Sequence, residues 1–262
     1  MSTAARAAHP LIDDPPHIFV DDVAARICDS LAASPLDYQL ANPGEPVLAA
    51  ARLSACVRSR YSADAFGESG LHQYVLLGAG LDHHRVSSDT RCWAVDLPNV
   101  LAWRANVFVE AGIHDACAPV PCDLGDEVLL QLLADAGLDT SQPVFVAWLG
   151  ATMYLEPTAV VSVLTQLGSL PVGSVLVADV ILPISGRDEA GREYAHALAE
   201  ALGGRELWRC TPSAEQIADW LGNAGWRAIT QVGEADAVPA GFWDRSDSLR
   251  PMRLVNLVQA HR

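Results

Sequence analysis

From Tyr74 onward the chain alternates short apolar runs with stretches whose apolar residues recur at helical spacing. The apolar runs lie at 74–79, 91–96, 118–121, 143–149 and 174–180, and the helical stretches lie near 98–111, 126–137 and 157–169. Neighbouring parallel strands need a long crossover connection, usually a helix, so this alternation is typical of a parallel sheet with helices packed on it. The pattern therefore predicts an α/β fold.

The segments on either side of this alternation complete a single domain. Residues 1–70 read as mostly helical, with apolar residues four positions apart in "VDDVAARICDSLAA". Residues 184–212 carry few strand signals and predict one or two helices. "PSAEQIADWLGNAGW" predicts a helix that ends at Gly225, and "WRAITQV" and "MRLVNLVQA" predict two last strands. Half of the 262 residues are hydrophobic, so we expect one domain over 1–262 with a sizeable core.

The net charge limits the class of partner. The chain has 32 acidic and 17 basic side chains, which give a formal net charge of −15. Binding to nucleic acid and to anionic membranes depends on Lys and Arg, so neither is expected. The expected partner is a small-molecule substrate, and a homodimer is compatible with the sequence.

The chain carries no obvious targeting signal. No apolar run approaches the ~20 residues of a membrane-spanning helix, and "MSTAARAAHPLIDDPP" lacks the apolar core of a signal peptide. The six cysteines show no Cys-x-x-Cys pair. We therefore expect a cytoplasmic protein whose cysteines are reduced thiols.

A glycine turn follows the first predicted strand, in "QYVLLGAGLDHHR" at residues 73–85. Gly78 and Gly80 allow a sharp turn and a close approach of a ligand, and Asp96 ends the next predicted strand, where an acid can bind a ribose diol. His83 stands where the dinucleotide fingerprint has a third glycine. Its presence weakens the case for NAD or FAD and favours S-adenosylmethionine, although the glycines could also form a simple strand-to-helix turn.

Motifs along most of the chain resemble the leucine carboxyl methyltransferase-like family of S-adenosylmethionine-dependent methyltransferases, in particular its actinobacterial small-molecule branch. The matching pieces are "RAAHPLIDDPP", "FVDDVAARI", "RSRYSADAF", "HQYVLLGAGLD", "AVDLPNVLAWR", "PCDLGD" and "VAWLGATMYLEPTAV". The resemblance implies a Rossmann-like seven-stranded methyltransferase sheet with helices on both faces. It also implies a helical N-terminal cover over 1–70, and we expect residues 184–212 to form part of a mobile lid.

The resemblance also implies roles at the methionine end of the cofactor. Arg58 and Arg60 are expected to meet the carboxylate, because a guanidinium fork matches that group. The turn Gly78, Ala79 and Gly80 is expected to pass under the methionine part, with Asp82 facing the amino group or a water. Surface charge is the alternative interpretation of the two arginines.

At the other end, the resemblance implies that Asp96 with Leu97 holds the ribose and that Asp123 and Leu124 flank the adenine. Trp148 and Leu149, with Gly150, are expected to end the fourth strand beside the transferring methyl group. Two alternatives stay open: Asp123 could cap a helix that starts near Asp126, and Trp148 could belong to the core.

The residues after the glycine turn depart from the family pattern. His83 and His84 stand where the family has Thr or Ser followed by an aromatic residue, and this difference leaves the acceptor contacts and the transfer itself open. Adjacent histidines at a helix start point about 100° apart, so a shared metal is not expected. A surface or capping role is the plain interpretation. The catalytic residue is unknown, and His83, His84, Tyr154 and Asp179 are the candidates for a base.

The sequence therefore predicts an S-adenosylmethionine-dependent O-methyltransferase that acts on a carboxylate or hydroxyl of a small secondary metabolite. Three alternatives stay open. The same fold could serve a cofactor-binding protein or a cyclase that transfers no methyl group. It could also methylate a protein carboxylate, as eukaryotic relatives do, or, more remotely, act as a nicotinamide-dependent dehydrogenase.

Overall fold

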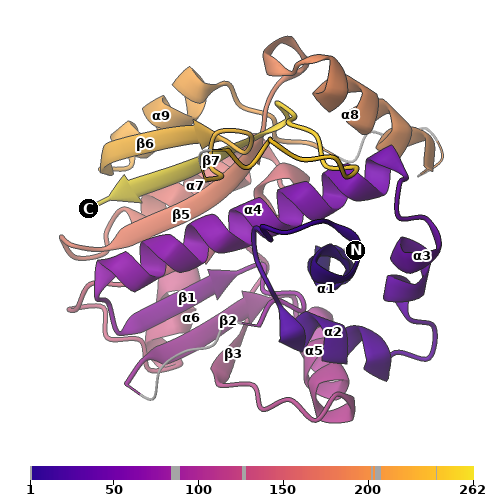
Figure 1. The fold of residues 1–262 in the computed structure, drawn as a ribbon. Coiled ribbons are helices and arrows are strands. Elements are labelled where there is room, and N and C mark those ends of the chain that lie inside the picture. The colour runs from indigo at the N-terminus through magenta and orange to yellow at the C-terminus, as the bar shows by residue number, and fades with distance from the viewer. Residues whose placement is uncertain (1, 84–88, 126–127, 202, 204–207, 240) are drawn as a thin grey trace.

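The computed structural model describes every residue except 1, 84–88, 126–127, 202, 204–207 and 240. One seven-stranded sheet lies at the centre of the molecule (Figure 1). Its strands are β1 (Gln73–Leu77), β2 (Arg91–Asp96), β3 (Cys117–Pro121), β4 (Phe145–Trp148), β5 (Val175–Ile181), β6 (Arg227–Gly233) and β7 (Val255–His261). Their order is β3-β2-β1-β4-β5-β7-β6. The first five strands are parallel, and β7 is antiparallel to both β5 and β6.

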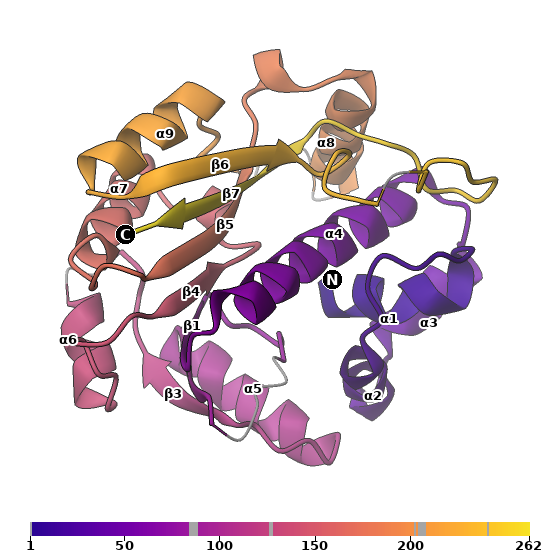
Figure 2. The same ribbon diagram turned by 60° about the vertical axis from the view of Figure 1, so that its left-hand side comes forward.

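Helices cover both faces of this sheet, as the sequence predicts (Figure 2). On one face lie α6 (Leu129–Asp135), α7 (Pro157–Leu167) and α9 (Ala214–Asn223), whose apolar residues share one hydrophobic cluster with the strands. On the other face lie α4 (Pro46–Ser69) and α5 (Pro98–Glu110). Strands β1, β4 and β5 are buried along their whole length, which explains why they read as continuous apolar runs.

The N-terminal helices form an additional layer outside α4. Helices α1 (Ser2–Ile12), α2 (Asp22–Ser30) and α3 (Pro35–Ala41) contact one another, and α1 packs along α4 while α2 reaches α5. Helix α8 (Glu189–Ala201) lies against α4 as well. The cover expected at the N-terminus thus corresponds to α1–α3, whereas α4 packs on the sheet itself. The lid role expected around α8 stays a prediction.

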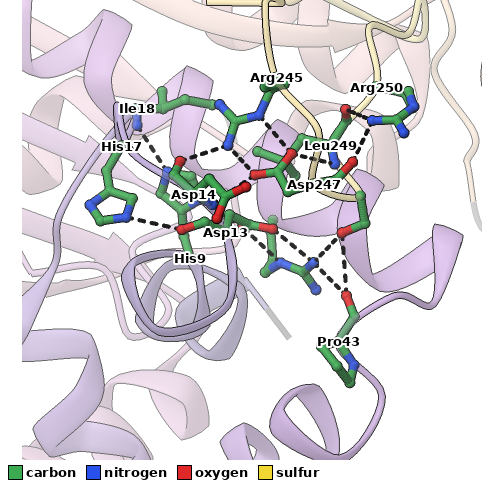
Figure 3. A network of polar contacts seen from close by, with 12 residues as sticks. His9, Asp13, Asp14, His17, Ile18, Pro43, Arg245, Asp247, Leu249 and Arg250 are labelled. Atoms are coloured by element: carbon green, nitrogen blue, oxygen red, sulfur yellow. Dashed lines mark hydrogen bonds and ion pairs between the residues drawn. The ribbon is translucent and has the colours of Figure 1, made fainter.

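A buried polar network anchors the C-terminal end of α1 (Figure 3). His9 Nδ1 lies 2.8 Å from Asp13 Oδ2, and the same oxygen accepts a hydrogen bond of 2.9 Å from Arg52 Nε on α4. These three side chains are fully buried. The Asp14 amide donates to Asp247 at 2.8 Å, which ties the same region to the loop before β7. The network therefore fixes α1 against α4 and the C-terminal part of the chain.

One expectation from the sequence is wrong. Cys92 and Cys117 form a disulfide instead of reduced thiols. They are direct partners in the β2–β3 pairing, with Cα atoms 4.4 Å apart, and this proximity depends on a strand register that the sequence does not display. Residues 78–83 form a loop, and the residues that would continue a helix from His83, 84–88, lie outside the described residues. Within the described chain, every helix is too short or too polar to span a bilayer.

Candidate active site

The candidate site lies where β1, β2 and β4 end at the same edge of the sheet. Leu77 at the end of β1 pairs with Val95 of β2 on one side and with Trp148 of β4 on the other. The loops that follow these strands are therefore neighbours in space. In open α/β sheets this edge is where ligands bind.

The two positions of the turn, Gly78 and Gly80, have glycine for different physical reasons. Gly78 has a φ of +65°, and a Cβ there would lie 2.6 Å from the Cβ of Ala151, so packing excludes a larger residue. Gly80 has a φ of +47°, and among the described residues a Cβ there would meet only the Gly78 carbonyl oxygen, at 4.0 Å. The space in front of Gly80 is therefore open. Asp96 Oδ2 accepts a hydrogen bond of 2.8 Å from the Gly80 amide, which places its carboxylate beside the turn.

Arg104 of α5 fixes the turn through hydrogen bonds to its carbonyl oxygens, a role that the sequence does not predict. Its Nη1 donates to the carbonyl oxygens of Gly80 at 3.0 Å and Asp82 at 2.7 Å, and its Nε donates to Asp115 at 2.7 Å. The Arg104 side chain is almost fully buried. Ala79 within the turn is also buried, and its amide donates to the Val95 carbonyl at 3.1 Å. An arginine in a helical pattern normally indicates an exposed face, so no sequence signal marks this role.

Asp82 faces a guanidinium in this structure. Its Oδ1 lies 2.7 Å from Arg6 Nη1, and Arg6 Nε lies 2.8 Å from Asp21 Oδ2. Helix α1 therefore places the buried Arg6 guanidinium beside the Asp82 carboxylate. The resemblance to the family implies a ligand amino group or a water at this position. The sequence cannot show this contact, because it depends on how α1 docks over the strand ends.

Arg58 of α4 lies at the end of β4. Its Nη2 donates to Ser2 Oγ at 2.7 Å, and its Nη1 lies 3.8 Å from Asp179 Oδ2. Gly150 has a φ of +68°, and a Cβ there would lie 3.2 Å from Arg58 Nη2. The glycine therefore lets the guanidinium lie directly against the end of β4.

Arg60 is not brought to the same place. Two residues apart on a helix corresponds to roughly 200° of rotation, so the two arginines point in opposite directions. Arg60 Nε pairs instead with Asp64 at 3.2 Å on the partly exposed side of α4. The structure thus separates the two arginines that the sequence assigns to one carboxylate.

Asp179 is fully buried inside β5 and bonds to the end of β4. Its Oδ1 accepts a hydrogen bond of 2.6 Å from the Gly150 amide, and no described residue donates a hydrogen bond to its Oδ2. Burial raises the pKa of Asp179, although the nearby Arg58 and the Gly150 amide oppose this effect. The Asp179 side chain therefore bonds to the loop after β4.

The remaining predicted residues divide between the core and the surface. Trp148 has no exposed area and lies in the hydrophobic cluster under α7, as its alternative interpretation holds. Leu149 packs in the cluster on the opposite face. Asp123 is exposed, and its Oδ1 accepts from the Gly125 amide at 3.0 Å, while Leu124 is buried. The described helix in this region, α6, begins at Leu129 with Val128 in the capping position, so Asp123 does not cap it.

The model of the leucine carboxyl methyltransferase family matches residues 1–168 of the chain. The chain belongs to this family. A candidate S-adenosyl-L-methionine-dependent methyltransferase of Mycobacterium bovis (strain BCG / Pasteur 1173P2) is 30% identical over 275 residues, covering 92% of this chain and 88% of its own.

Solved structures share the fold of this family member. A candidate methyltransferase from Thermobifida fusca YX has a TM-score of 0.61 at 21% identity, covering 91% of this chain and 94% of its own. Human N-acetylserotonin methyltransferase in complex with SAM has a TM-score of 0.50 at 11% identity, covering 92% of this chain and 66% of its own. The resemblance to the family and the expected fold are thus confirmed.

Two cavities of this family member adjoin the strand ends. The smaller one, of about 50 Å³, is lined by Arg6, Asp82 and His83 among others. The larger one, of about 290 Å³, is lined by Arg58, Gly150 and apolar side chains of α4, β5 and α8. Residues of α1 line both cavities, Arg6 in the smaller one and Ser2 and Ala5 in the larger one.

The candidate bases differ in their surroundings. His83 is partly buried in the smaller cavity, its ring centroid lies 5.9 Å from that of Phe108, and burial lowers the pKa of His83. His84 falls outside the described residues. Tyr154 is half exposed and lines the larger cavity from the short 3-10 helix η1 (Thr152–Tyr154).

Glu234 is a buried acid that sequence reasoning missed. It follows β6, is 1% exposed, and its Oε2 accepts a hydrogen bond of 3.0 Å from Ser54 Oγ on α4. Burial raises the pKa of Glu234 to about 8. The two residues are 180 positions apart, and "GEADA" reads as a polar turn, so no local signal pairs them.

Proposed function

We propose that this protein transfers a methyl group from S-adenosylmethionine to a carboxylate or hydroxyl oxygen of a small metabolite. The observation that carries the proposal is the open turn at Gly80, with the Asp96 carboxylate beside it and Arg58 against Gly150 at the next strand end. In this proposal the ribose binds at Asp96, the methionine carboxylate binds at Arg58, and the methyl group lies near Gly150.

The residues at the strand ends fit the cofactor. A Cβ would protrude into the open space at Gly80, so this space suits a ligand that lies close to the backbone. Asp96, with Leu97 after it, lies where two ribose hydroxyls can be bound together. We assign the ribose to Asp96 and the adenine to the loop with Asp123 and Leu124.

The methionine end is assigned to Arg58. Its guanidinium matches a carboxylate geometrically and is partly accessible, with a side-chain exposure of 15%. Asp82 contributes to the amino group in this proposal, and Arg6 shares its carboxylate. Arg60 has no role, because it lies on the other side of α4.

When bound, S-adenosylmethionine supplies a methyl group on a positively charged sulfur. The residues of the chain must then align the acceptor oxygen with this carbon and exclude water. The larger cavity supports this step, since Met153, Tyr194 and Trp208 give it mostly apolar walls next to Gly150. Its volume of about 290 Å³ suits a small molecule rather than a folded protein surface.

The proposal is tested with S-adenosylmethionine labelled in its methyl group. The protein is incubated with a small-molecule extract of an actinobacterium and, separately, with the protein fraction. Label in an extracted small molecule supports the proposal, and label in protein favours a protein carboxyl methyltransferase. Tight cofactor binding without any transfer favours a protein that binds the cofactor for another purpose. Asp96→Ala serves as the control that should not transfer label.

A further inference from the structure

The larger cavity has mostly apolar walls and one buried polar pair. Met153, Tyr194, Leu198, Trp208 and Leu254 provide the apolar surface. Such walls bind an apolar or aromatic body, since apolar lining with a few polar groups is typical of small-molecule sites. The polar groups therefore decide which end of an acceptor points toward Gly150.

Ser54 and Glu234 form the polar pair. Ser54 lines the cavity, and its hydroxyl donates to Glu234 Oε2 at 3.0 Å. Glu234 is 1% exposed, and its Oε1 is buried without a hydrogen-bond partner among the residues that the structure describes. A buried carboxyl group with an unpaired oxygen costs folding free energy, so its presence next to a ligand cavity calls for a chemical reason.

This pair lies close to the expected methyl group. Ser54 and Arg58 are four residues apart on α4, so they share one face of the helix and are separated by about 6 Å along its axis. Arg58 in turn contacts the position of Gly150 and lies 3.8 Å from Asp179. An acceptor oxygen bonded to Ser54 is thus one helical turn from the site assigned to the methionine end.

The charges around the cavity select the kind of acceptor. Among the described residues that line it, Arg58 is the one cation, and it already faces Asp179. Glu234 and Asp179 are both buried acids. A carboxylate acceptor would add a third acid beside a cation that the cofactor also needs, whereas a hydroxyl adds no charge.

On the basis of the methyl-transfer function above, we propose that the acceptor is a phenol or enol hydroxyl on an apolar body and that Ser54 relays its proton to Glu234. The acceptor O–H bond breaks and its proton passes to Ser54 Oγ, while the proton of Ser54 moves to Glu234 Oε2. The acceptor oxygen bonds to the methyl carbon, and the electron pair of the broken methyl–sulfur bond stays on sulfur. One carboxylate and one sulfonium are consumed, and the products are a neutral acid, ether and thioether.

The relay requires Glu234 to be ionised, so the pKa of Glu234 sets how turnover depends on pH. Burial raises the pKa of Glu234 to about 8, with smaller contributions in the same direction from two nearby acids. The groups that face Glu234 are Ser54 and Arg58 from α4, Asp179 from β5, Asp188 just before α8, and Tyr194 within α8. A phenol has a pKa of about 10, so a carboxylate with a pKa near 8 is a competent base for it. Turnover should rise with pH and level off above about pH 8.

The test compares 4-butylphenol with 4-butylbenzoate as acceptors, between about pH 6 and pH 9, by formation of S-adenosylhomocysteine. Four proteins are measured: wild type, Glu234→Gln, Ser54→Ala, and Glu215→Gln as a control for an exposed acid on α9. Calorimetric titration with S-adenosylmethionine is run in parallel.

We expect turnover of the phenol and not of the benzoate. Glu234→Gln should lose about a hundredfold or more and the rise with pH, while its cofactor affinity stays within about twofold. Ser54→Ala should show the same loss of turnover and of the rise with pH, and Glu215→Gln should match wild type.

Three results would overturn the relay. The enzyme could prefer the benzoate, it could bind the cofactor and methylate neither acceptor, or Glu234→Gln could keep turnover within about tenfold with the pH profile intact. Failure of the wild type to bind S-adenosylmethionine would instead contradict the methyl-transfer function itself. If Glu234→Gln does not fold, Ser54→Ala alone decides the question.

Discussion

Replacing Glu234 by Gln should change how the free energy of unfolding depends on pH. Glu234 is 1% exposed and accepts a hydrogen bond from Ser54, while no described residue bonds to its Oε1. Burial raises its pKa from 4.5 to about 8 in the folded protein. Between these values the folded state holds a proton that the unfolded chain releases, so stability is present below about pH 4.5 and is lost as the pH rises through about 8. Glutamine has the same shape and does not titrate.

The magnitude follows from proton linkage. One proton contributes about 1.4 kcal/mol per pH unit, so wild type should lose about 3 kcal/mol relative to Glu234→Gln between about pH 5.5 and pH 7.5. The assay is equilibrium urea denaturation of both proteins at both pH values, with Glu215→Gln as the exposed control. Groups that titrate in every protein cancel in the comparison. Parallel stability curves for wild type and Glu234→Gln, within about 1 kcal/mol, would refute the buried protonated state of Glu234.

Three further predictions concern anchoring, the turn and the histidine. Arg52→Ala should destabilise the fold by about 3–5 kcal/mol in urea denaturation, because it leaves Asp13 buried without its cation, whereas Arg60→Ala should change stability by less than about 0.5 kcal/mol. Gly80→Val should abolish S-adenosylmethionine binding in calorimetry, while Gly44→Val, at another open glycine, should not; normal binding by the first variant would make the turn merely structural. His83→Ala should keep turnover within about tenfold and carry no stoichiometric zinc or iron, and a loss of more than a hundredfold with intact cofactor affinity would make His83 the base.

The sheet could be predicted because its central strands β1, β4 and β5 are buried along their whole length and therefore read as continuous apolar runs. The apolar runs at 74–79 and 91–96 correspond to β1 and β2, and the helical pattern near 98–111 corresponds to α5. The glycine turn could be predicted because its sequence follows a strand directly. Local patterns of this kind depend on neighbours within one element, so they are visible in the sequence.

The candidate site could be predicted only where a motif encodes it. Asp96 lies beside the turn as the motif implies. The contact of Arg6 with Asp82 and that of Ser54 with Glu234 depend on how distant helices dock, and no local pattern records this. The two arginines of the Arg-x-Arg element lie on different sides of α4, because residues two apart on a helix point in nearly opposite directions.

Calorimetric titration of S-adenosylmethionine into wild type and Asp96→Ala tests the central claim, that the cofactor lies across the ends of β1 and β2, most directly. Asp64→Ala, which removes an exposed carboxylate on α4, is the matched control. We predict that wild type and Asp64→Ala bind with equal affinity, and that folded Asp96→Ala binds about ten- to a hundredfold more weakly, because the unpaired ribose hydroxyls cost roughly 1–3 kcal/mol. Absence of binding by wild type, or unchanged affinity in Asp96→Ala, would contradict the claim.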